Sequence, residues 1–504
     1  MKHFKKIVSL LLTAVMVLAM CIPVMADAAT TYSITIDNAT EGHTYEAYQI
    51  FAGELSTDGL SLSNIVWGSG VSEAGKNYFD DAKTKAETLK SEAEAKTFAK
   101  EVSKYLTTPA GTVNTVTNGK YVINDLTSGY YLIKDKDSSL NGKNDTYTSY
   151  ILKVVQNVSV KPKSEKPSSY KKVKDINDST SAETGWQDSA DYDIGDKVPF
   201  QLTGIVAGDY ASYKAYKFVF HDKQSNGLTF NSGSVKVFVD KIEVDKNAYR
   251  VVTATDDGDT FDIIFDDLKN ISAVQPNSVI TVEYDATLNK NAIIGEAGNP
   301  NEMQLEYSNN PNDDQGGETG KTPVDKVIVF TYKTVVNKTN PDGISLAGAE
   351  FKLEKFVKNA GASDEYNGVK GRWEEKSTTD PITSETTSFE FKGLDDGIYR
   401  LTETKHPTDY NAIEPIYFEI SATHDSNSDD PKLIDLNGNK LEGEISFTKN
   451  ISDGSLTTSV ANYKGSELPS TGGIGTTIFY VVGVILMLGA GVLLVTKKRM
   501  SSNR

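Results

Sequence analysis

The chain has 504 residues, of which 24% are charged and 38% hydrophobic, and its formal net charge is −17. This composition is that of folded globular domains and excludes both a disordered tail and a polytopic membrane protein. Because Asp and Glu outnumber Lys and Arg by 69 to 52, the surface repels phosphate groups, and nucleic acid is not expected as a partner. The single cysteine, Cys21, excludes disulfide bonds and thiolate metal sites in the folded part.

Both ends of the chain have the pattern of targeting segments. Lysines precede an apolar run, and small residues follow it, so residues 1–28 are predicted to be a signal peptide. Residues 474–495 contain no charge and are long enough to form a transmembrane segment. The basic residues that follow predict a cytoplasmic tail over residues 496–504.

The remaining chain is long enough for three domains. A Lys/Pro/Ser-rich linker over residues 161–169 ends a first domain at residues 29–160, and an Asn/Asp/Gly-rich stretch lies near the end of a second domain at residues 170–320. A third domain then occupies residues 325–465.

Short runs of alternating β-branched and aromatic residues dominate these domains. They include residues 32–36, 216–220, 235–239, 278–284 and 389–391. Such strands, separated by Gly, Asn and Asp turns, predict a mainly β protein built of tandem immunoglobulin-like β-sandwiches.

One segment of the first domain has helical spacing instead. Apolar residues recur every three or four positions from Phe79 to Tyr105, and Pro109 ends the pattern. We expect a helix that packs on the first sandwich.

The segment before the transmembrane segment resembles a sorting signal. Leu468, Pro469, Ser470, Thr471 and Gly472 match the LPXTG signal of Gram-positive surface proteins, and the apolar span and basic tail follow in the expected order. In that family a sortase cleaves between the Thr and the Gly and joins the Thr to an amine. The resemblance implies a secreted protein that is held briefly in the membrane and then anchored to the cell wall.

The third domain resembles the Cna B-type domains of Gram-positive pilins. The segments that carry the resemblance are residues 335–340, 346–353, 393–404 and 460–465. In that family a Lys of the first strand forms an isopeptide bond with an Asn of the last strand, assisted by a Glu in a Y-x-L-x-E-T motif. The resemblance assigns these roles to Lys338, Asn462 and Glu403. Without the motifs, Lys338 and Glu403 would be interpreted as a salt bridge.

The second domain resembles the isopeptide-forming domain of pilus backbone proteins. The matching segments are residues 170–175, 193–196, 221–222, 227–230 and 305–311. The resemblance implies a bond between a first-strand Lys and Asn309, with Asp222 as the assisting acid. Strand alternation favours Lys171, which shares a face with Val173, and leaves Lys172 as the alternative.

The first domain departs from this pattern. Its segment 129–135 resembles the motif around the assisting Glu, with Asp135 in the Glu position, but no Lys occurs between residues 29 and 75. We therefore expect no internal crosslink of this type there.

The linker resembles the pilin motif V-x-V-Y-P-K, whose Lys attacks the sortase-bound Thr of the next subunit. Aligned on Pro162, the acceptor is Lys163. Because Lys161 stands where the family has Tyr, Lys161 is the alternative acceptor.

The order of these segments is that of a pilus shaft subunit. The resemblance implies covalent polymerisation with identical subunits by a pilin-specific sortase, minor pilins as further partners, and attachment to peptidoglycan by a housekeeping sortase. A monomeric wall-anchored adhesin is the alternative. No enzyme activity other than formation of the internal bonds, no cofactor and no metal site is expected, because His43, His221, His406 and His424 lie in no catalytic motif.

Overall fold

The computed structural model describes part of the chain, namely residues 30–162, 165–253, 255, 257–359, 361–465, 483–484 and 486–488. The predicted signal peptide, Lys163 and the sorting signal at 468–472 lie outside the described residues. Within the described residues, no helix has the length and apolar character that a membrane span needs.

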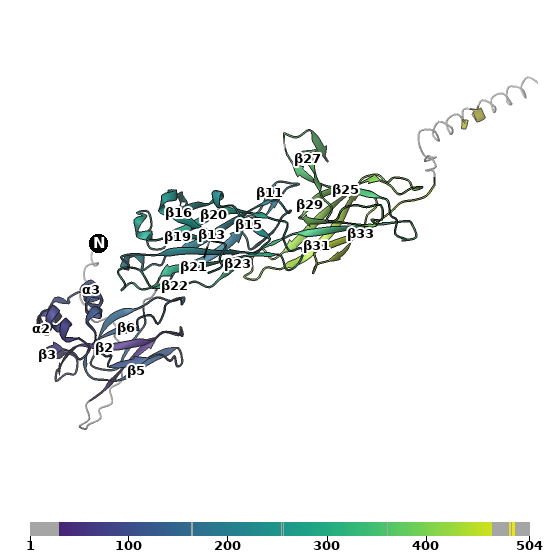
Figure 1. Ribbon diagram of the computed structural model, residues 1–504. Coiled ribbons are helices and arrows are strands. Elements are labelled where there is room, and N and C mark those ends of the chain that lie inside the picture. The colour runs from purple at the N-terminus through teal and green to yellow at the C-terminus, as the bar shows by residue number, and fades with distance from the viewer. Residues whose placement is uncertain are drawn as a thin grey trace, which may run out of the picture. The chain divides into compact units, whose positions relative to one another are not determined.

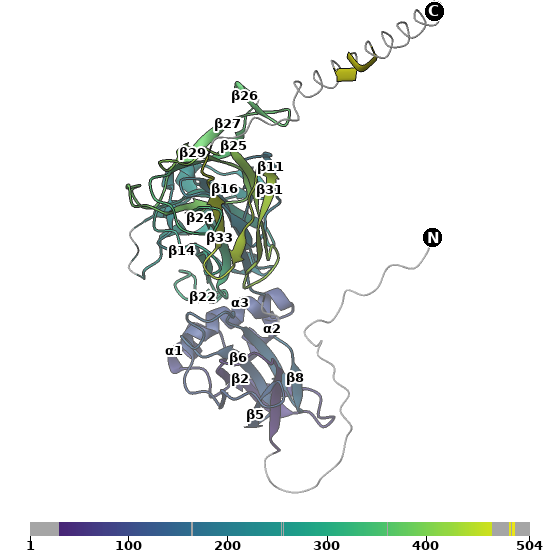
Figure 2. The ribbon, with the colours of Figure 1, turned by 90° about the vertical axis from the view of Figure 1, so that its right-hand side faces the viewer.

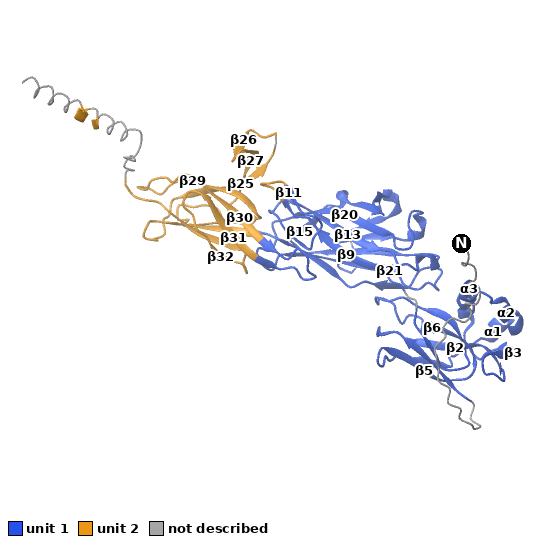
Figure 3. Ribbon diagram, turned by 180° about the vertical axis from the view of Figure 1, so that it is seen from behind, with its two compact units in different colours: residues 1–176, 182–331, 423–434 blue, residues 177–181, 332–422, 435–504 orange. Residues whose placement is uncertain are grey.

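The chain forms two compact units (Figure 3). Unit 1 comprises residues 1–176, 182–331 and 423–434, and unit 2 comprises residues 177–181, 332–422 and 435–504. The first and second predicted domains both fall in unit 1, and each has apolar clusters of its own.

The first part of unit 1 contains two β-sheets (Figure 1). The smaller sheet has the order β5-β1-β8, from β1 (Tyr32–Asp37), β5 (Lys120–Leu126) and β8 (Val158–Val160). The larger sheet has the order β3-β2-β6-β7 with β4 beside β2, from β2 (Tyr45–Leu55), β3 (Leu62–Trp67), β4 (Gly111–Val113), β6 (Gly129–Asp135) and β7 (Ser149–Val154).

The predicted single helix is three short helices, α1 (Glu73–Tyr78), α2 (Ala82–Thr88) and α3 (Glu92–Val102). The breaks have local causes, because the Asp81 side chain caps α2 and the Ser91 side chain caps α3. The Ser91 hydroxyl accepts from the N–H of Glu94, and the Glu94 carboxylate accepts from the N–H of Lys90 and the Ser91 hydroxyl, so a new helix begins here. Buried Phe98 and Val102 pack with Phe51 of β2, so the helices cover the larger sheet as expected (Figure 2).

The second part of unit 1 is a β-sandwich of two sheets with one large apolar cluster. One sheet has the order β17-β16-β20-β13-β9 with β15 beside β20, from β9 (Ser168–Val173), β13 (Lys197–Ile205), β15 (Leu228–Phe230), β16 (Lys236–Val239), β17 (Ile242–Glu243) and β20 (Val279–Leu288). The other has the order β12-β23-β21-β14-β19-β18 with β22 beside β21, from β12 (Ser189–Asp191), β14 (Phe218–Gln224), β18 (Arg250–Val252), β19 (Phe261–Phe265), β21 (Asn299–Ser308), β22 (Thr319–Lys321) and β23 (Asp325–Phe330). A short pair, β10 (Ile176–Asn177) and β11 (Ala182–Glu183), lies outside both sheets.

Unit 2 is a second sandwich. Its smaller sheet has the order β28-β24-β33-β32, from β24 (Tyr332–Thr339), β28 (Ser388–Leu394), β32 (Thr448–Asn450) and β33 (Ser455–Ala461). The larger sheet has the order β26-β27-β25-β29-β30-β31, from β25 (Glu350–Lys358), β26 (Asp364–Tyr366), β27 (Val369–Lys376), β29 (Gly397–Lys405), β30 (Ile416–His424) and β31 (Leu433–Glu442). The predicted fold class, mainly β with tandem sandwiches, is confirmed.

Candidate functional site

A lysine, a glutamate and an asparagine meet inside unit 2, where the first and last strands of the sandwich run side by side. β24 and β33 are parallel, and their register sets Lys338 opposite Val460, two residues before Asn462. The Nζ of Lys338 lies 3.4 Å from Glu403 Oε1. Glu403 Oε2 accepts a hydrogen bond of 2.9 Å from Asn462 Nδ2. The glutamate therefore contacts both the amine and the amide.

All three side chains are buried. Lys338 and Glu403 have no exposed side-chain surface, and Asn462 is likewise fully buried. Burial lowers the pKa of Lys338, although the nearby charge of Glu403 opposes this effect. Glu403 Oε1 and Asn462 Oδ1 each accept no hydrogen bond from the described residues.

These properties are those that a Lys–Asn condensation requires. A lysine attacks a carbonyl only when its amine is neutral, and burial favours the neutral form. A protonated carboxyl group beside the amide can polarise the carbonyl and give a proton to the departing ammonia. Packing in a folded core holds the reactants together and raises their effective molarity.

A second buried lysine lies between the sheets of the unit 1 sandwich. Lys171 of β9 forms an ion pair with Asp222 of β14, and both side chains are fully buried. Lys171 Nζ also donates a hydrogen bond of 2.9 Å to the hydroxyl of Tyr284, which donates to Asp222 Oδ2 at 2.8 Å. Lys172 is half-buried and pairs with Asp188 instead, so the alternation argument selected the inward-facing lysine.

Burial acts on both members of the Lys171–Asp222 pair. It lowers the pKa of Lys171 against the opposing charge of Asp222. Burial also raises the pKa of Asp222, against the opposing charge of Lys171. Both shifts favour a neutral amine beside a neutral carboxyl group.

The predicted partner, Asn309, is not at this site. Its Nδ2 donates hydrogen bonds to the carbonyl oxygens of Leu140 and Asp145, at 3.0 and 3.1 Å. The register of β14 and β21 sets Asp222 opposite Met303, and Asn309 is six residues farther along, about 20 Å at the rise of a strand. The structure therefore does not support the predicted Lys171–Asn309 pairing.

Asn301 occupies the position that Asn309 was predicted to hold. Its Nδ2 donates a hydrogen bond of 2.9 Å to the Tyr284 hydroxyl, the same group that accepts from Lys171. Asn301 is fully buried. Its Oδ1 and the Oδ1 of Asp222 accept no hydrogen bond from the described residues, which repeats the arrangement at Glu403 and Asn462.

The sequence pattern could not choose among the asparagines of this strand. Asn299, Asn301 and Tyr307 alternate on the buried face of β21, and Asn309 continues the same phase. Asn299 has another role, because its Nδ2 donates to the carbonyl oxygens of Ile293 and Val329. The sequence signal for Asn301 was a polar side chain on an otherwise apolar strand face. No sequence signal indicated Tyr284.

The first part of unit 1 has a different arrangement at the equivalent place. β1 and β8 are parallel, and Ile36 lies opposite Val160 as Lys338 lies opposite Val460. An apolar, fully buried side chain thus stands where the third domain has its lysine.

Asp135, in the position of the assisting Glu, pairs with His43 in place of a lysine. The Nδ1 of His43 is 2.7 Å from Asp135, and its Nε2 is 3.3 Å from Asp145. Burial disfavours the charged imidazolium, but hydrogen bonds to the two carboxylates outweigh it and raise the pKa of His43 to about 9. The first domain therefore has a buried ion cluster at this place.

His221 precedes Asp222 but faces away from Lys171. Its Nδ1 is 2.9 Å from Asp262, and its Nε2 is 3.0 Å from Glu306. Burial opposes protonation, but the hydrogen bond to Glu306 and the charge of Asp262 raise the pKa of His221. Both ring nitrogens of His221 are therefore occupied by carboxylates other than Asp222.

The intersubunit sites are described only in part. Lys161 follows β8 and is exposed. Lys163 and residues 468–472 lie outside the described residues, so their predicted roles stay predictions.

Comparison with known proteins places three segments in families. Residues 194–311 match the Gram-positive pilin backbone subunit 2, Cna-B-like domain. Residues 333–431 match a prealbumin-like fold domain, and residues 461–502 match the LPXTG cell wall anchor motif. Together these segments span about half of the chain.

Similar whole proteins are also backbone or surface proteins of Gram-positive bacteria. The trypsin-resistant surface T6 protein of Streptococcus pyogenes serotype M6 is 27% identical, over 61% of this chain and 65% of its own length. The solved structure of the T6 backbone pilin, described as a modular three-domain structure, covers 88% of this chain and all of its own, with 19% identity and a TM-score of 0.54.

The full-length major pilin SpaD of Corynebacterium diphtheriae covers 88% of this chain and 99% of its own, with 17% identity and a TM-score of 0.49. The matched families are those of structural subunits and not of enzymes. With its Cna-B-like and prealbumin-like domains and its cell wall anchor motif, the chain belongs to the Gram-positive backbone pilins of the cell surface.

Proposed function

We propose that this chain is the shaft subunit of a covalently polymerised pilus and that two internal isopeptide bonds stabilise it. The bonds join Lys338 to Asn462 and Lys171 to Asn301. The observation that carries the proposal is the buried set of Lys338, Glu403 and Asn462, in which one acid contacts both reacting groups.

The reaction balances without any external reagent. The neutral amine of the lysine attacks Cγ of the asparagine, the new C–N bond forms, and the original amide nitrogen leaves as ammonia. Glu403 and Asp222 serve as the acids in the two sites, and each begins and ends the reaction with the same number of protons. In the second site, the Tyr284 hydroxyl holds the amine and the amide next to the acid.

Two features of the chain support this chemistry. Cys21 is the one cysteine and lies in the predicted signal peptide, so disulfide bonds cannot constrain the folded domains. A covalent bond that spans a domain would supply the constraint that secreted proteins commonly obtain from cystine. The related T6 protein is named for its resistance to trypsin, a property that such bonds would explain.

Subunits are joined through the sorting signal and the linker. A sortase would cleave after Thr471 and transfer the threonine to a lysine of the next subunit. Pro162 has a fixed backbone angle and no N–H, so it cannot join a sheet interior. Lys163 is the proposed acceptor, and exposed Lys161 is the alternative. A pilin-specific sortase would build the polymer of identical subunits and minor pilins, and a housekeeping sortase would attach it to peptidoglycan.

Intact mass tests the internal bonds. The folded wild type should be lighter than its sequence mass by two ammonia molecules, and Glu403→Gln and Asn301→Ala should each restore one. Asn309→Ala is the matched control and should restore none. A wild type of unmodified mass would contradict both bonds. Restoration by Asn309→Ala, with none by Asn301→Ala, would return the second bond to Asn309.

Assembly is tested by immunoblotting of wall extracts boiled in SDS. The wild type should give a ladder of covalent multimers, Lys163→Ala should give wall-anchored monomer alone, and Thr471→Ala should give neither ladder nor anchoring. Loss of the ladder in Lys161→Ala instead would move the acceptor by two residues. A wild type that forms no ladder with its own sortase would favour the monomeric adhesin.

A further inference from the structure

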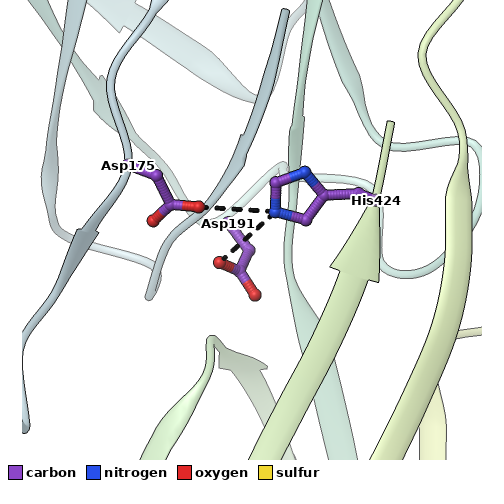
Figure 4. A group of neighbouring side chains, drawn as sticks. All are labelled: Asp175, Asp191 and His424. Carbon is purple, nitrogen blue, oxygen red and sulfur yellow. Dashed lines mark ion pairs between the residues drawn. The ribbon is translucent and has the colours of Figure 1, made fainter. Parts of the chain in front are cut away.

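A second kind of site lies in unit 1, where the segment 423–434 runs beside β12. The backbone N–H of Asp188 donates to the carbonyl oxygen of Ser426 at 3.0 Å, and the N–H of Ser428 donates to the Asp188 side chain at 2.9 Å. These hydrogen bonds fix the segment along the strand and set the ring of His424 over Asp191 (Figure 4).

His424 faces two carboxylates with one nitrogen (Figure 4). Its Nε2 is 3.3 Å from Asp175 Oδ2 and 4.0 Å from Asp191 Oδ1. The three side chains are 10%, 14% and 2% exposed for His424, Asp175 and Asp191. Asp175 and Asp191 thus bring two largely buried carboxylates to one ring nitrogen.

The hydrogen bonds at the other ring nitrogen fix the tautomer. The Ser189 hydroxyl donates its one proton to the carbonyl oxygen of Asp425. It therefore accepts at its contact of 2.7 Å with His424 Nδ1, which must carry the hydrogen. In the neutral ring, Nε2 then presents its lone pair to Asp175 and Asp191. A histidine that binds a metal is typically held in this way, with its other N–H given to a fixed acceptor.

The distances distinguish this site from the paired histidines of the same unit. His43 and His221 each have a carboxylate oxygen within 2.7–2.9 Å of Nδ1, the length of a charge-assisted hydrogen bond. The carboxylate oxygen nearest to the His424 ring is 3.3 Å from Nε2, so no ion pair of His424 among the described residues is this short, although His43 Nε2 also lies 3.3 Å from Asp145. Two ligands that are each about 2.1 Å from one ion lie roughly 3.0–3.4 Å apart at tetrahedral or right angles and about 4.2 Å apart when opposite. The separation of 3.3 Å from Asp175 falls in the first range, and the separation of 4.0 Å from Asp191 lies between the two values.

We propose that Asp175, Asp191 and His424 bind one divalent transition-metal ion. One imidazole nitrogen with two carboxylate oxygens suits Zn²⁺ or Mn²⁺ better than Ca²⁺, which takes oxygen ligands alone. The two positive charges of the ion would balance the two carboxylates, and water would complete the coordination. The three residues are far apart in the sequence, which explains why no spacing motif indicated a metal and why the sequence analysis expected none.

Calorimetric titration of the purified chain with Zn²⁺, after removal of metals with EDTA, tests the site. We expect one equivalent of Zn²⁺ to bind. The dissociation constant should rise at least 100-fold in His424→Gln and in Asp175→Asn. Ser189→Ala keeps all three ligands but removes the acceptor of the Nδ1 hydrogen, and should weaken binding about 10- to 100-fold. Mn²⁺ should bind at the same site more weakly, in the usual order of affinities.

Matched controls separate this site from other histidines. His406 is exposed, and His406→Gln should leave the affinity for Zn²⁺ unchanged. The wild type and His424→Gln should melt at similar temperatures in EDTA, and Zn²⁺ should raise the melting temperature of the wild type alone. Absence of binding, or binding that His424→Gln does not change, would overturn the proposal. Loss of binding in His221→Gln in place of His424→Gln would overturn it as well.

Discussion

Replacement of Asn462 by alanine should remove the proposed internal bond of unit 2 while the strands that surround it stay in place. The side chain follows β33 and contacts Glu403 and the carbonyl oxygen of Asn411. It lies at the end of the parallel pair that joins the first and last strands. In the variant, Lys338 and Glu403 would remain as a buried ion pair.

The expected loss follows from the length of chain that the bond closes. A crosslink from Lys338 to Asn462 closes a loop of about 125 residues, and the loss of chain entropy in the unfolded state then contributes about 5 kcal/mol at 25 °C. The entropy of unfolding is about 2 cal/mol/K per residue, so for a domain of about 130 residues this corresponds to a fall in Tm of roughly 15–20 °C.

Differential scanning calorimetry can measure this change, because the two units can melt as separate transitions. Glu403→Gln keeps the size of the acid and should lower Tm by a similar amount. Thr458→Val is the matched control for packing. It changes a buried residue of the same strand whose hydroxyl makes no hydrogen bond with the described residues, and it should shift Tm by only a few degrees. If Asn462→Ala melts within a few degrees of the wild type, the entropic argument for the bond is wrong.

Three other predictions concern unit 1. Because the pKa of His43 is raised from 6.5 to about 9 in the folded state, its ion cluster contributes stability below pH 6.5 that is lost as the pH rises to 9. The loss is roughly 3 kcal/mol, and urea unfolding followed by tryptophan fluorescence, with Trp67 kept and the other two tryptophans replaced by Phe, should detect it with His43 present and not in His43→Gln. Ser91→Ala removes the cap of α3 and should destabilise the first domain by about 1 kcal/mol in the same assay. Asn309→Ala removes the hydrogen bonds to Leu140 and Asp145, and limited proteolysis should then cut the loop before β7 faster, whereas unchanged cleavage would mean that these bonds do not hold the loop.

The three residues that meet in the third domain could be named from the sequence, whereas the set in the second domain could not. The roles of Lys338 and Asn462 depend on two adjacent parallel strands, so residues near the two ends of the domain were enough to place them together. The second site joins two sheets, with Lys171 on one and Asn301 on the other. Contact across a sandwich depends on how the sheets stack, and alternation fixes only the face on which a side chain lies.

The other differences have equally local causes. The segment from Phe79 to Tyr105 is largely helical, as its apolar spacing predicted, but the capping side chains of Asp81 and Ser91 divide it into shorter helices. Apolar spacing alone gives no information on where such caps lie. The sequence indicated one member of the His43 cluster, because Asp135 matches the position of the assisting acid. Its partner His43 had no comparable signal, because the resemblance implies a lysine and not a histidine beside the acid.

The proposed bonds also define which parts of the chain carry tension in a pilus. Force in the pilus acts between the acceptor lysine and Thr471 of each subunit. In each bonded domain the crosslink transmits this force, and the chain between the two bonded residues carries no load. The load then passes in order through Lys163, Lys171, Asn301, Lys338, Asn462 and Thr471. The first domain ends before Lys163 and lies outside this path. A buried ion cluster can therefore suffice there, while each of the two loaded domains would need the proposed covalent bond.

The load path predicts how the chain extends under force. With the chain held at Lys163 and Thr471 in a single-molecule pulling experiment, the wild type should extend without unfolding of either bonded domain. Asn462→Ala should add one unfolding step that releases about 120 residues, or roughly 400 Å at the contour length of an extended chain. Asn301→Ala should add a separate step of similar length, since the loop from Lys171 to Asn301 is about as long. Asn309→Ala should add no step. Full-length unfolding of both domains in the wild type would show that the bonds do not shield them, because a covalent bond between the loaded strands permits no such extension.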